Sequence, residues 1–246
     1  MIVGFVGAGS MAAAIARGWR GELEAMLFSD SGSGRARALA EELGGEVATN
    51  EEIAGRADLV LLAVKPNKLE EVAPALAEAG EIVSVLAATP LERLRAALPG
   101  AGQVLRVMPN VGVEVRQGVL CVAGSASDEA QEKLQLLGHV VELPEGDFDA
   151  ATAVMGCSPA YLALAVEAIA DAGAADGLDP ELARELVVET AVGTAELLRR
   201  HDPAAVRKAV ASPGGSTEKG LEALDREGAR EAFAAAVRAS LERMRG

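Results

Sequence analysis

The stretch IVGFVGAGSMA, residues 2–12, joins an unbroken apolar run to two closely spaced glycines and the start of an alanine-rich segment. Ile2–Val6 has the composition of a buried strand, and the segment from Ser10 has that of a helix. Between them, Gly7, Gly9 and Ala12 form a G-x-G-x-x-A pattern, in which the glycines allow a tight turn and the close approach of a pyrophosphate. The start of the helix would offer free N–H groups and a partial positive charge to the phosphates. The stretch therefore predicts a dinucleotide-binding strand–turn–helix unit, the alternative being a glycine turn that binds no nucleotide.

The first half of the chain repeats this alternation of short apolar runs and amphipathic segments. The expected strands are residues 2–6, 25–29, 59–64, 82–86, 103–107 and 118–122, and the expected helices are residues 10–19, 34–43, 68–79, 90–98 and 128–137. Strands separated by helices indicate βαβ units and a mostly parallel sheet, and uninterrupted apolar strands suit a sheet that is covered on both faces. We therefore predict an α/β Rossmann-type N-terminal domain.

The second half changes character, because the strand patterns end at Asp147. The expected helices there are residues 160–175, 180–200, 203–210, 218–223 and 231–245. Gly156–Pro159 interrupts an otherwise helical pattern, since proline lacks a backbone donor, and Ser212–Gly215 has the composition of a tight loop. We predict a dinucleotide-binding Rossmann domain at residues 1–148 and an all-α domain at residues 149–246.

Composition limits the classes of partner. Hydrophobic residues make up 50% of the chain and aromatic residues only 2%, so the core must be largely aliphatic. A net charge of −14 opposes nucleic acid and anionic membranes as partners. Cys121 and Cys157 have neither disulfide nor metal-ligand spacing, so we expect reduced thiols and no metal. Neither a signal peptide nor a bilayer-spanning run is evident, which favours a cytoplasmic protein.

The end of the second expected strand bears on the choice between NAD and NADP. Asp30 lies where an acidic residue would bind the ribose 2′-hydroxyl of NAD. The residues that follow, Ser31, Ser33, Arg35 and Arg37, could instead hold the 2′-phosphate of NADP, because arginine presents a planar fork of donors. The two arginines could equally be solvated helix residues, so both cofactors stay open.

Six features in order along the chain carry a family resemblance. They are GFVGAGSMA at 4–12, Asn50, AVKP at 63–66, RVMPN at 106–110, SPAY at 158–161 and SPGGST at 212–217. Together they resemble the pyrroline-5-carboxylate reductase family. The resemblance implies reduction of the cyclic imine L-1-pyrroline-5-carboxylate to L-proline, the last step of proline biosynthesis. It also implies NADPH as the cofactor, with NADH possible, and a homodimer or a higher oligomer of dimers. The all-α domain at residues 149–246 would then serve substrate binding and dimerisation.

The resemblance also implies site residues. Those expected to bind the cofactor are Val6, Gly7, Ala8, Gly9, Ser10, Met11, Asp30, Asn50, Ala63, Val64, Lys65, Pro66 and Ala87. Those expected to bind the substrate are Glu145, Gly215, Ser216 and Thr217, with Thr217 as the catalytic residue that hydrogen-bonds the ring nitrogen. The glycines of SPGGST expose backbone N–H groups that can bind a carboxylate. The alternative is that Ser216 or Thr217 only caps the next helix.

Three positions depart from the family pattern. Ser158 and Ala88 stand where the family has glycine, and Leu86 adds bulk beside the expected nicotinamide site. These changes leave open a non-catalytic nucleotide-binding paralogue. Another imine reductase of the same architecture is a further alternative. A β-hydroxyacid dehydrogenase is disfavoured, because residues 160–175 contain no lysine to act as general acid.

Overall fold

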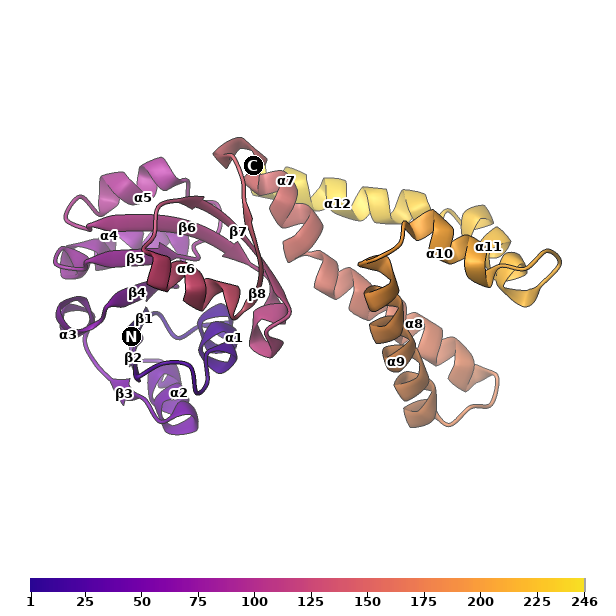
Figure 1. Ribbon diagram of the computed structural model, residues 1–246, viewed down its shortest axis with the longest axis horizontal. Coiled ribbons are helices and arrows are strands. Elements are labelled where there is room, and N and C mark those ends of the chain that lie inside the picture. Colours follow the sequence, from indigo (N-terminus) through magenta and orange to yellow (C-terminus); the bar gives the residue numbers. More distant parts are fainter. Residues whose placement is uncertain (246) are drawn as a thin grey trace. The chain divides into compact units, whose positions relative to one another are not determined.

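The computed structural model describes residues 1–245, which form two compact units, Met1–Gly156 and Cys157–Met244 (Figure 1). The division follows Gly156, whereas the predicted domain boundary is residue 148. The intervening segment belongs to the first unit because Phe148 and Met155 pack there against Met108.

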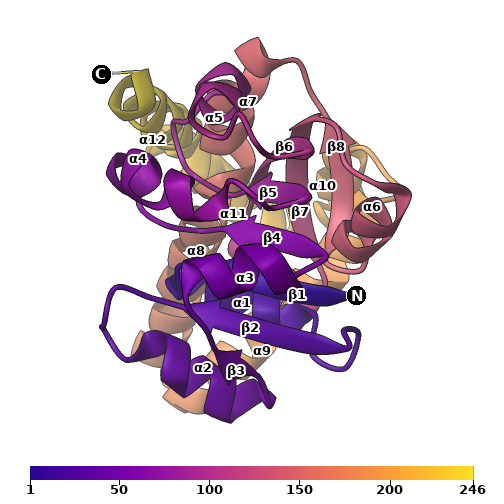
Figure 2. The ribbon, with the colours of Figure 1, turned by 90° about the vertical axis from the view of Figure 1, so that its left-hand side faces the viewer.

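One sheet of eight strands forms the first unit, in the order β3-β2-β1-β4-β5-β6-β7-β8. In Figure 2 the strands rise in this order from β3 at the bottom through β2, β1, β4 and β5 to β6. The strands are β1 (Ile2–Val6), β2 (Ala25–Ser29), β3 (Glu46–Val47), β4 (Leu59–Leu62), β5 (Glu81–Ser84), β6 (Gln103–Pro109), β7 (Gly118–Gly124) and β8 (Gly138–Glu142). Within residues 1–245 all neighbouring pairs are parallel except β6 and β7. The mostly parallel Rossmann-type sheet predicted from the sequence is confirmed.

Helices cover both faces of this sheet. The helices of one face are α1 (Ser10–Gly18), α2 (Arg35–Leu43) and α6 (Asp128–Gln135), and those of the other are α3 (Asn50–Arg56), α4 (Leu69–Val72) and α5 (Leu91–Ala97). Successive residues of β1 serve the two faces, since Phe5 lies in the core under α1 and Val6 in the core under α3. The sheet is therefore buried on both sides, as its apolar strands require.

Among the strands and the helices that flank the sheet, β3, β8 and α3 are absent from the sequence prediction. β3 has only two residues, both exposed, and β8 is an edge strand without a fully buried residue, so neither produces a continuous apolar run. The helix α3 carries a recognisable start signal. The hydroxyl of Thr49 accepts the N–H of Glu52 at 3.2 Å, and the Glu52 carboxylate accepts the N–H of Thr49 at 2.8 Å. This capping box is readable as T-x-x-E in the sequence.

An aromatic group forms the centre of one face. The rings of Phe5 and Phe28 stack with centroids 4.8 Å apart, and Trp19 meets Phe5 edge-on at 6.1 Å. The indole Nε1 of the buried Trp19 donates to the carbonyl of Lys133 at 2.7 Å, so burial leaves no indole donor unsatisfied. The core predicted to be aliphatic thus has an aromatic centre, which fixes α1 against β1 and β2.

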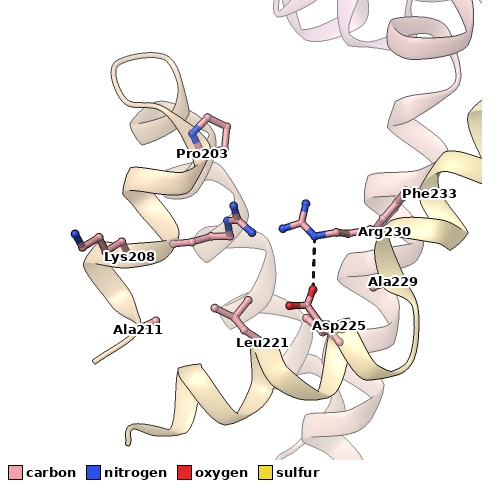
Figure 3. Close-up of a pocket in the computed structure, with 10 residues that line it drawn as sticks. Pro203, Lys208, Ala211, Leu221, Asp225, Ala229, Arg230 and Phe233 are labelled. Carbon is pink, nitrogen blue, oxygen red and sulfur yellow. Dashed lines mark ion pairs between the residues drawn. The ribbon is translucent and has the colours of Figure 1, made fainter. Parts of the chain in front are cut away.

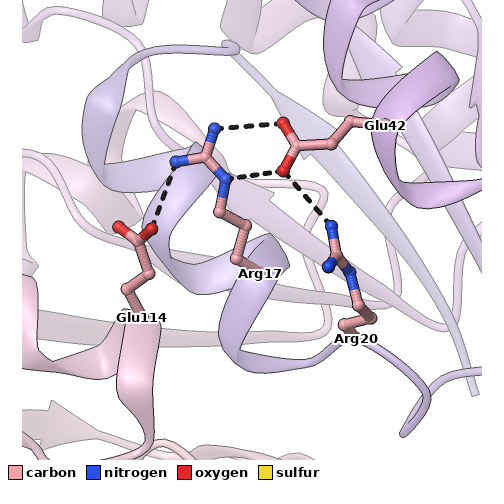
Figure 4. A network of polar contacts seen from close by, with 4 residues as sticks. All are labelled: Arg17, Arg20, Glu42 and Glu114. Atoms are coloured by element: carbon pink, nitrogen blue, oxygen red, sulfur yellow. Dashed lines mark hydrogen bonds and ion pairs between the residues drawn. The ribbon is translucent and has the colours of Figure 1, made fainter.

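Charged side chains hold the C-terminal end of α1 (Figure 4). Arg17 donates to both carboxylate oxygens of Glu42, at 2.8 and 3.0 Å, and to Glu114 at 3.3 Å. The hydrogen bond from Arg17 lowers the pKa of the Glu42 carboxyl. Arg116 donates to the carbonyls of Gly18 and Arg20 at 2.8 and 2.9 Å, which satisfies acceptors at the end of the helix. These contacts fix the orientation of the helix whose other end follows Gly9.

The second unit contains helices alone among the residues that the structure describes. They are α8 (Ser158–Ala175), α9 (Pro180–Leu198), α10 (Pro203–Val210), α11 (Ser216–Arg226) and α12 (Ala229–Arg245). The predicted all-α second half is confirmed. The helical run Glu145–Ala175 is, by length and composition, apolar enough to cross a membrane. The absence of a membrane span therefore stays a prediction.

Candidate functional site

A cleft of about 400 Å³ lies at the carboxyl ends of the strands, where the chain order of the sheet reverses between β1 and β4. The lining residues are Val6, Gly7, Ala8, Gly9, Ser29, Asp30, Ser31, Ser33, Arg35, Asn50, Ala63, Val64, Lys65, Lys68, Glu71 and Val72. Such a reversal point is where open α/β sheets bind ligands. Of the predicted cofactor residues, Ser10, Met11, Pro66 and Ala87 are not among the lining residues. Ser10 and Met11 begin α1, while Pro66 and Ala87 follow β4 and β5.

Gly7 and Gly9 have different roles in this cleft. Gly7 has φ +101°, and a Cβ there would lie 2.7 Å from the carbonyl oxygen of Ala63, so the turn requires glycine. A Cβ at Gly9 would meet no protein atom within 4 Å. Gly9 therefore leaves the room in which a ligand can approach the backbone.

The start of α1 suits a phosphate. Its N-cap is Gly9, which provides no side-chain cap, and the first turn contains no acidic residue. The N–H groups of the first turn have no intrahelical acceptor, and the helix dipole adds partial positive charge. The residues present thus fit the pyrophosphate of a dinucleotide.

The carboxylate of Asp30 is engaged by its own loop. One oxygen accepts the N–H of Gly32 at 2.8 Å, and the other accepts the Ser33 hydroxyl at 2.8 Å and the N–H of Ala36 at 3.0 Å. These bonds, with that from Ala36 the largest cause, lower the pKa of the Asp30 carboxyl. Asp30 therefore shapes the loop that brings Ser31, Ser33 and Arg35 to the cleft, whereas Arg37 does not line it.

Asn50 and Lys65, two further residues predicted to bind the cofactor, have different neighbours. The Asn50 side-chain oxygen accepts the hydroxyl of Ser29 at 2.6 Å, which links the start of α3 to the end of β2. Lys65 is exposed and makes no ion pair within residues 1–245, whereas Lys68 pairs with Glu71. Lys65 is thus a cation that can meet a phosphate or a ribose.

The segment after β5 corrects one expectation. Leu86 is 1% exposed and belongs to the buried cluster that contains Leu62 and Leu91, so the expectation that it adds bulk beside the cofactor is wrong. Ala88 has φ +49°, in the region that favours glycine. The glycine that the family pattern has at this position therefore has a conformational reason.

The SPGGST loop leads into α11. Gly214 has φ +74° and donates its N–H to the carboxylate of Glu218 at 2.8 Å, and the N–H of Gly215 donates to the carbonyl of Ser212 at 2.9 Å. The N-cap of α11 is Gly215, with no side-chain cap, so the alternative that Ser216 or Thr217 caps the helix is wrong.

The side chains at the start of α11 face solvent. Ser216 and Thr217 are exposed, and within residues 1–245 neither hydroxyl makes a hydrogen bond. Together with the first-turn N–H groups of α11, these hydroxyls are available to a small polar ligand.

Glu145 lies in a polar contact that the sequence prediction missed. Its carboxylate accepts Nη1 of Arg106 at 2.6 Å and the N–H of Leu91 at 3.1 Å. Arg106 is 3% exposed, and its guanidinium lies 4.2 Å from the ring centroid of Phe148. Glu145 thus neutralises a buried cation and anchors the start of α5. Its contact with substrate stays a prediction.

A second cavity, of about 600 Å³, lies within the helical unit (Figure 3). Leu221, Leu224 and Phe233 supply apolar walls. Arg230 extends over it and pairs with Asp225 at 3.5 Å. None of residues 212–217 lines this cavity, so it is distinct from the SPGGST loop.

Residues 1–245 contain no group of three or more His, Cys, Asp or Glu side chains placed to hold a metal ion. Cys121 and Cys157 are both free thiols. Burial raises the pKa of the Cys121 thiol, which keeps it protonated and unreactive.

Two family models match different parts of the chain, and curated relatives match nearly its whole length. Residues 145–246 match the family model described as pyrroline-5-carboxylate reductase dimerisation, and residues 2–88 match that described as NADP oxidoreductase, coenzyme F420-dependent. The pyrroline-5-carboxylate reductase of Thermus thermophilus is 37% identical over 257 residues, covering 99% of this chain and 97% of the relative.

Solved structures of pyrroline-5-carboxylate reductases are also similar to this chain over nearly its whole length. The pyrroline-5-carboxylate reductase of Streptococcus pyogenes has a TM-score of 0.85 at 30% identity, with 99% of this chain and 98% of that chain covered. The pyrroline carboxylate reductase of Plasmodium falciparum, solved with NADP bound, has a TM-score of 0.84 at 26% identity, with 99% and 97% covered.

Proposed function

This chain belongs to the pyrroline-5-carboxylate reductase family, and we propose that it reduces L-1-pyrroline-5-carboxylate to L-proline, the last step of proline biosynthesis. The observation that carries the proposal is the cleft between β1 and β4. It has an uncapped helix N-terminus, a glycine turn and an open approach at Gly9. The SPGGST loop supplies a second set of polar groups of the kind that a small carboxylate needs.

NADPH is the proposed cofactor, with NADH as the second donor. The N–H groups from Ala8 to Met11 would bind the pyrophosphate. Ser31, Ser33 and Arg35 would bind a 2′-phosphate, which the engagement of Asp30 by its own loop favours. When bound, the cofactor supplies the hydride that reduces the imine carbon.

The remaining predicted cofactor residues would hold the two ends of the molecule. Asn50 would contact the adenosine end. The segment Ala63, Val64, Lys65 and Pro66, with Val6 and Ala87, would line the path toward the nicotinamide. All of these residues follow or end parallel strands at the same edge of the sheet.

The proposed substrate residues are Glu145, Gly215, Ser216 and Thr217. Backbone N–H groups at the start of α11 would bind the carboxylate, and the hydroxyl of Thr217 would hydrogen-bond the ring nitrogen. Protonation of that nitrogen makes the imine carbon electrophilic, so the chain's own residues mainly orient the reactants and exclude water. A substrate contact by Glu145 would have to be made beside its bond to Arg106.

A dimerisation domain is present at residues 145–246. We propose a cytoplasmic homodimer, or a higher oligomer of dimers, that binds neither nucleic acid nor membrane. The exposed apolar side chains of the helical unit, such as Leu164, Ile169 and Phe233, support a second copy as their cover. The net charge of −14 supports the absence of nucleic acid.

Initial rates of NADPH and NADH oxidation with racemic pyrroline-5-carboxylate test the reaction. We expect turnover with both and a larger kcat/KM with NADPH. Thr217→Ala should lower kcat/KM for the imine by roughly tenfold or more with the Kd for NADPH unchanged, and Thr217→Ser should retain most activity. Absence of turnover, with NADPH still raising the Tm, would redirect the function to another imine or to a non-catalytic nucleotide-binding protein.

A further inference from the structure

The carbonyl of Met155 lacks its helical donor. The segment Thr152–Gly156 is a π-helix, and α8 begins two residues later, at Ser158. In an α-helix the carbonyl of residue 155 would accept the N–H of residue 159, but Pro159 has none. The next donor along, the N–H of Ala160, bonds the carbonyl of Cys157 at 3.1 Å instead. The sequence therefore requires Met155 to find a partner elsewhere.

Asn110 provides that partner. Its Nδ2 donates to the carbonyl of Met155 at 3.2 Å, while its Oδ1 accepts the N–H groups of Gly112 and Val119, each at 3.2 Å. The two backbone donors fix the orientation of the amide, because a flipped side chain would present hydrogens to them. Asn110 thus ties the turn after β6, the start of β7 and the π-helix together.

The contact between Asn110 and Met155 lies at the edge of the sheet that holds the nucleotide cleft. β6 is parallel to β5, so Asn110 follows the strand end at the same edge of the sheet as the nucleotide cleft. Met155 lies one residue before Gly156, where the first compact unit ends. Its side chain packs in the cluster of Met108 and Phe148, so that both its backbone and its side chain are held.

We infer that Asn110 is a positioning residue, which fixes the conformation of the π-helix Thr152–Gly156 before α8 by binding the backbone carbonyl that Pro159 leaves without a partner. This inference rests on the proposed function for its effect on catalysis, because the proposed substrate residue Glu145 begins the same helical run, Glu145–Ala175. Asn110 acts through Met155 and need not touch substrate. Pro159 keeps this segment from continuing as a regular α-helix, and Asn110 sets its conformation.

The variant Asn110→Asp tests the hydrogen bond that the Asn110 side chain donates to the carbonyl of Met155. The carboxylate keeps an acceptor for Gly112 and Val119 but replaces the donor toward Met155. We expect amide hydrogen exchange in residues 152–162 to become about fivefold to tenfold faster, as loss of one hydrogen bond implies. We expect kcat/KM for the imine to fall by about tenfold or more, with the Kd for NADPH within about twofold of the original. Gln131→Glu is the matched control, since it makes the same change in a side chain that donates to the Ala126 carbonyl at 3.0 Å.

Pro159→Ala supplies the decisive second variant, because it restores the N–H that Met155 lacks. In this background Asn110→Asp should have little effect on exchange or on kcat/KM. An equal effect of Asn110→Asp in both backgrounds, or unchanged exchange in the single variant, would overturn the inference. If Asn110→Asp does not fold alone, rescue of folding by Pro159→Ala supports the inference and failure of rescue contradicts it. If the unmodified protein turns over no imine, the proposed function fails, while exchange still decides the role of Asn110.

Discussion

The two units differ in where their apolar side chains go. In the first, most residues of the strands β1, β2, β4, β5 and β6 and the inner face of each flanking helix are buried, and the aromatic rings of Phe5, Trp19 and Phe28 are grouped inside. In the second, among the residues described, only Ala170 and Ala183 are buried hydrophobics. Large side chains such as Leu164 and Leu186 are at least half exposed there. One unit completes its core within the chain and the other does not.

This difference explains the ambiguous character of the run Glu145–Ala175, which is apolar enough for a membrane. A helix that is apolar on several faces must be covered, by lipid or by protein. The run begins the segment that matches the dimerisation family, which points to a second copy of this chain as the cover. We propose that the exposed apolar surface of the helical unit is the interface of the proposed homodimer.

The largest effect expected from this comparison is on assembly. Leu186→Lys should weaken the dimer by about 100-fold or more, because burial of one leucine contributes about 1.5 to 3 kcal/mol and a two-fold interface contains the residue twice. Val47→Lys is the matched control, since Val47 is 51% exposed and Leu186 is 50% exposed. Val47 lies on the edge strand β3, so its variant should assemble normally. Sedimentation equilibrium measures the dimer dissociation constant of both variants. Equal constants would contradict the inference that the helical unit, and not the first unit, forms the dimer interface.

The next largest effect is expected at the glycine turn between β1 and α1 of the first unit. Gly7→Ala should destabilise the protein by about 2 to 4 kcal/mol and abolish nucleotide binding, because its methyl group would press on the backbone of Ala63 at a positive φ. Gly9→Ala should leave the Tm unchanged and still weaken NADPH binding, because its methyl enters only ligand space. Thermal unfolding and fluorescence titration separate the two. A Gly9→Ala variant that binds NADPH normally would place the pyrophosphate elsewhere.

A smaller effect is expected at the ion pair between the buried Arg106 and the partly exposed Glu145. Glu145→Ala leaves the guanidinium of Arg106, 3% exposed, without its anion, and should cost about 2 kcal/mol. Glu114→Ala removes an exposed partner of Arg17 and should cost less than about 1 kcal/mol. Urea unfolding measures both differences. An unaltered stability of Glu145→Ala, together with a raised KM for the imine, would assign Glu145 to substrate binding instead.

The sequence predicted the fold well because apolar periodicity reflects burial, and burial is what distinguishes β1 or β4 from its surroundings. The two-residue strand β3 and the half-exposed β8 have no such signal. The glycine turn at Gly7 was predictable because only one residue type fits it. The partners of Asp30, Arg106 and Asn110 were not, since each depends on which distant backbone or side chain the fold brings within hydrogen-bond reach.

The smallest effect expected is a gain in stability at Ala88. Its φ of +49° costs an L-residue about 1 to 2 kcal/mol, whereas glycine adopts it freely. Glycine also gains about 0.4 to 1 kcal/mol of entropy in the unfolded chain, so Ala88→Gly should raise the free energy of unfolding by only about 0.5 to 1 kcal/mol. Ala87→Gly, next to it, gains no such relief and should destabilise, which makes it the control in a urea titration. A loss of stability in Ala88→Gly would mean that the strain at this turn is relieved by contacts of the alanine methyl group. The completed core of the first unit would then extend to this turn, where the family pattern has glycine.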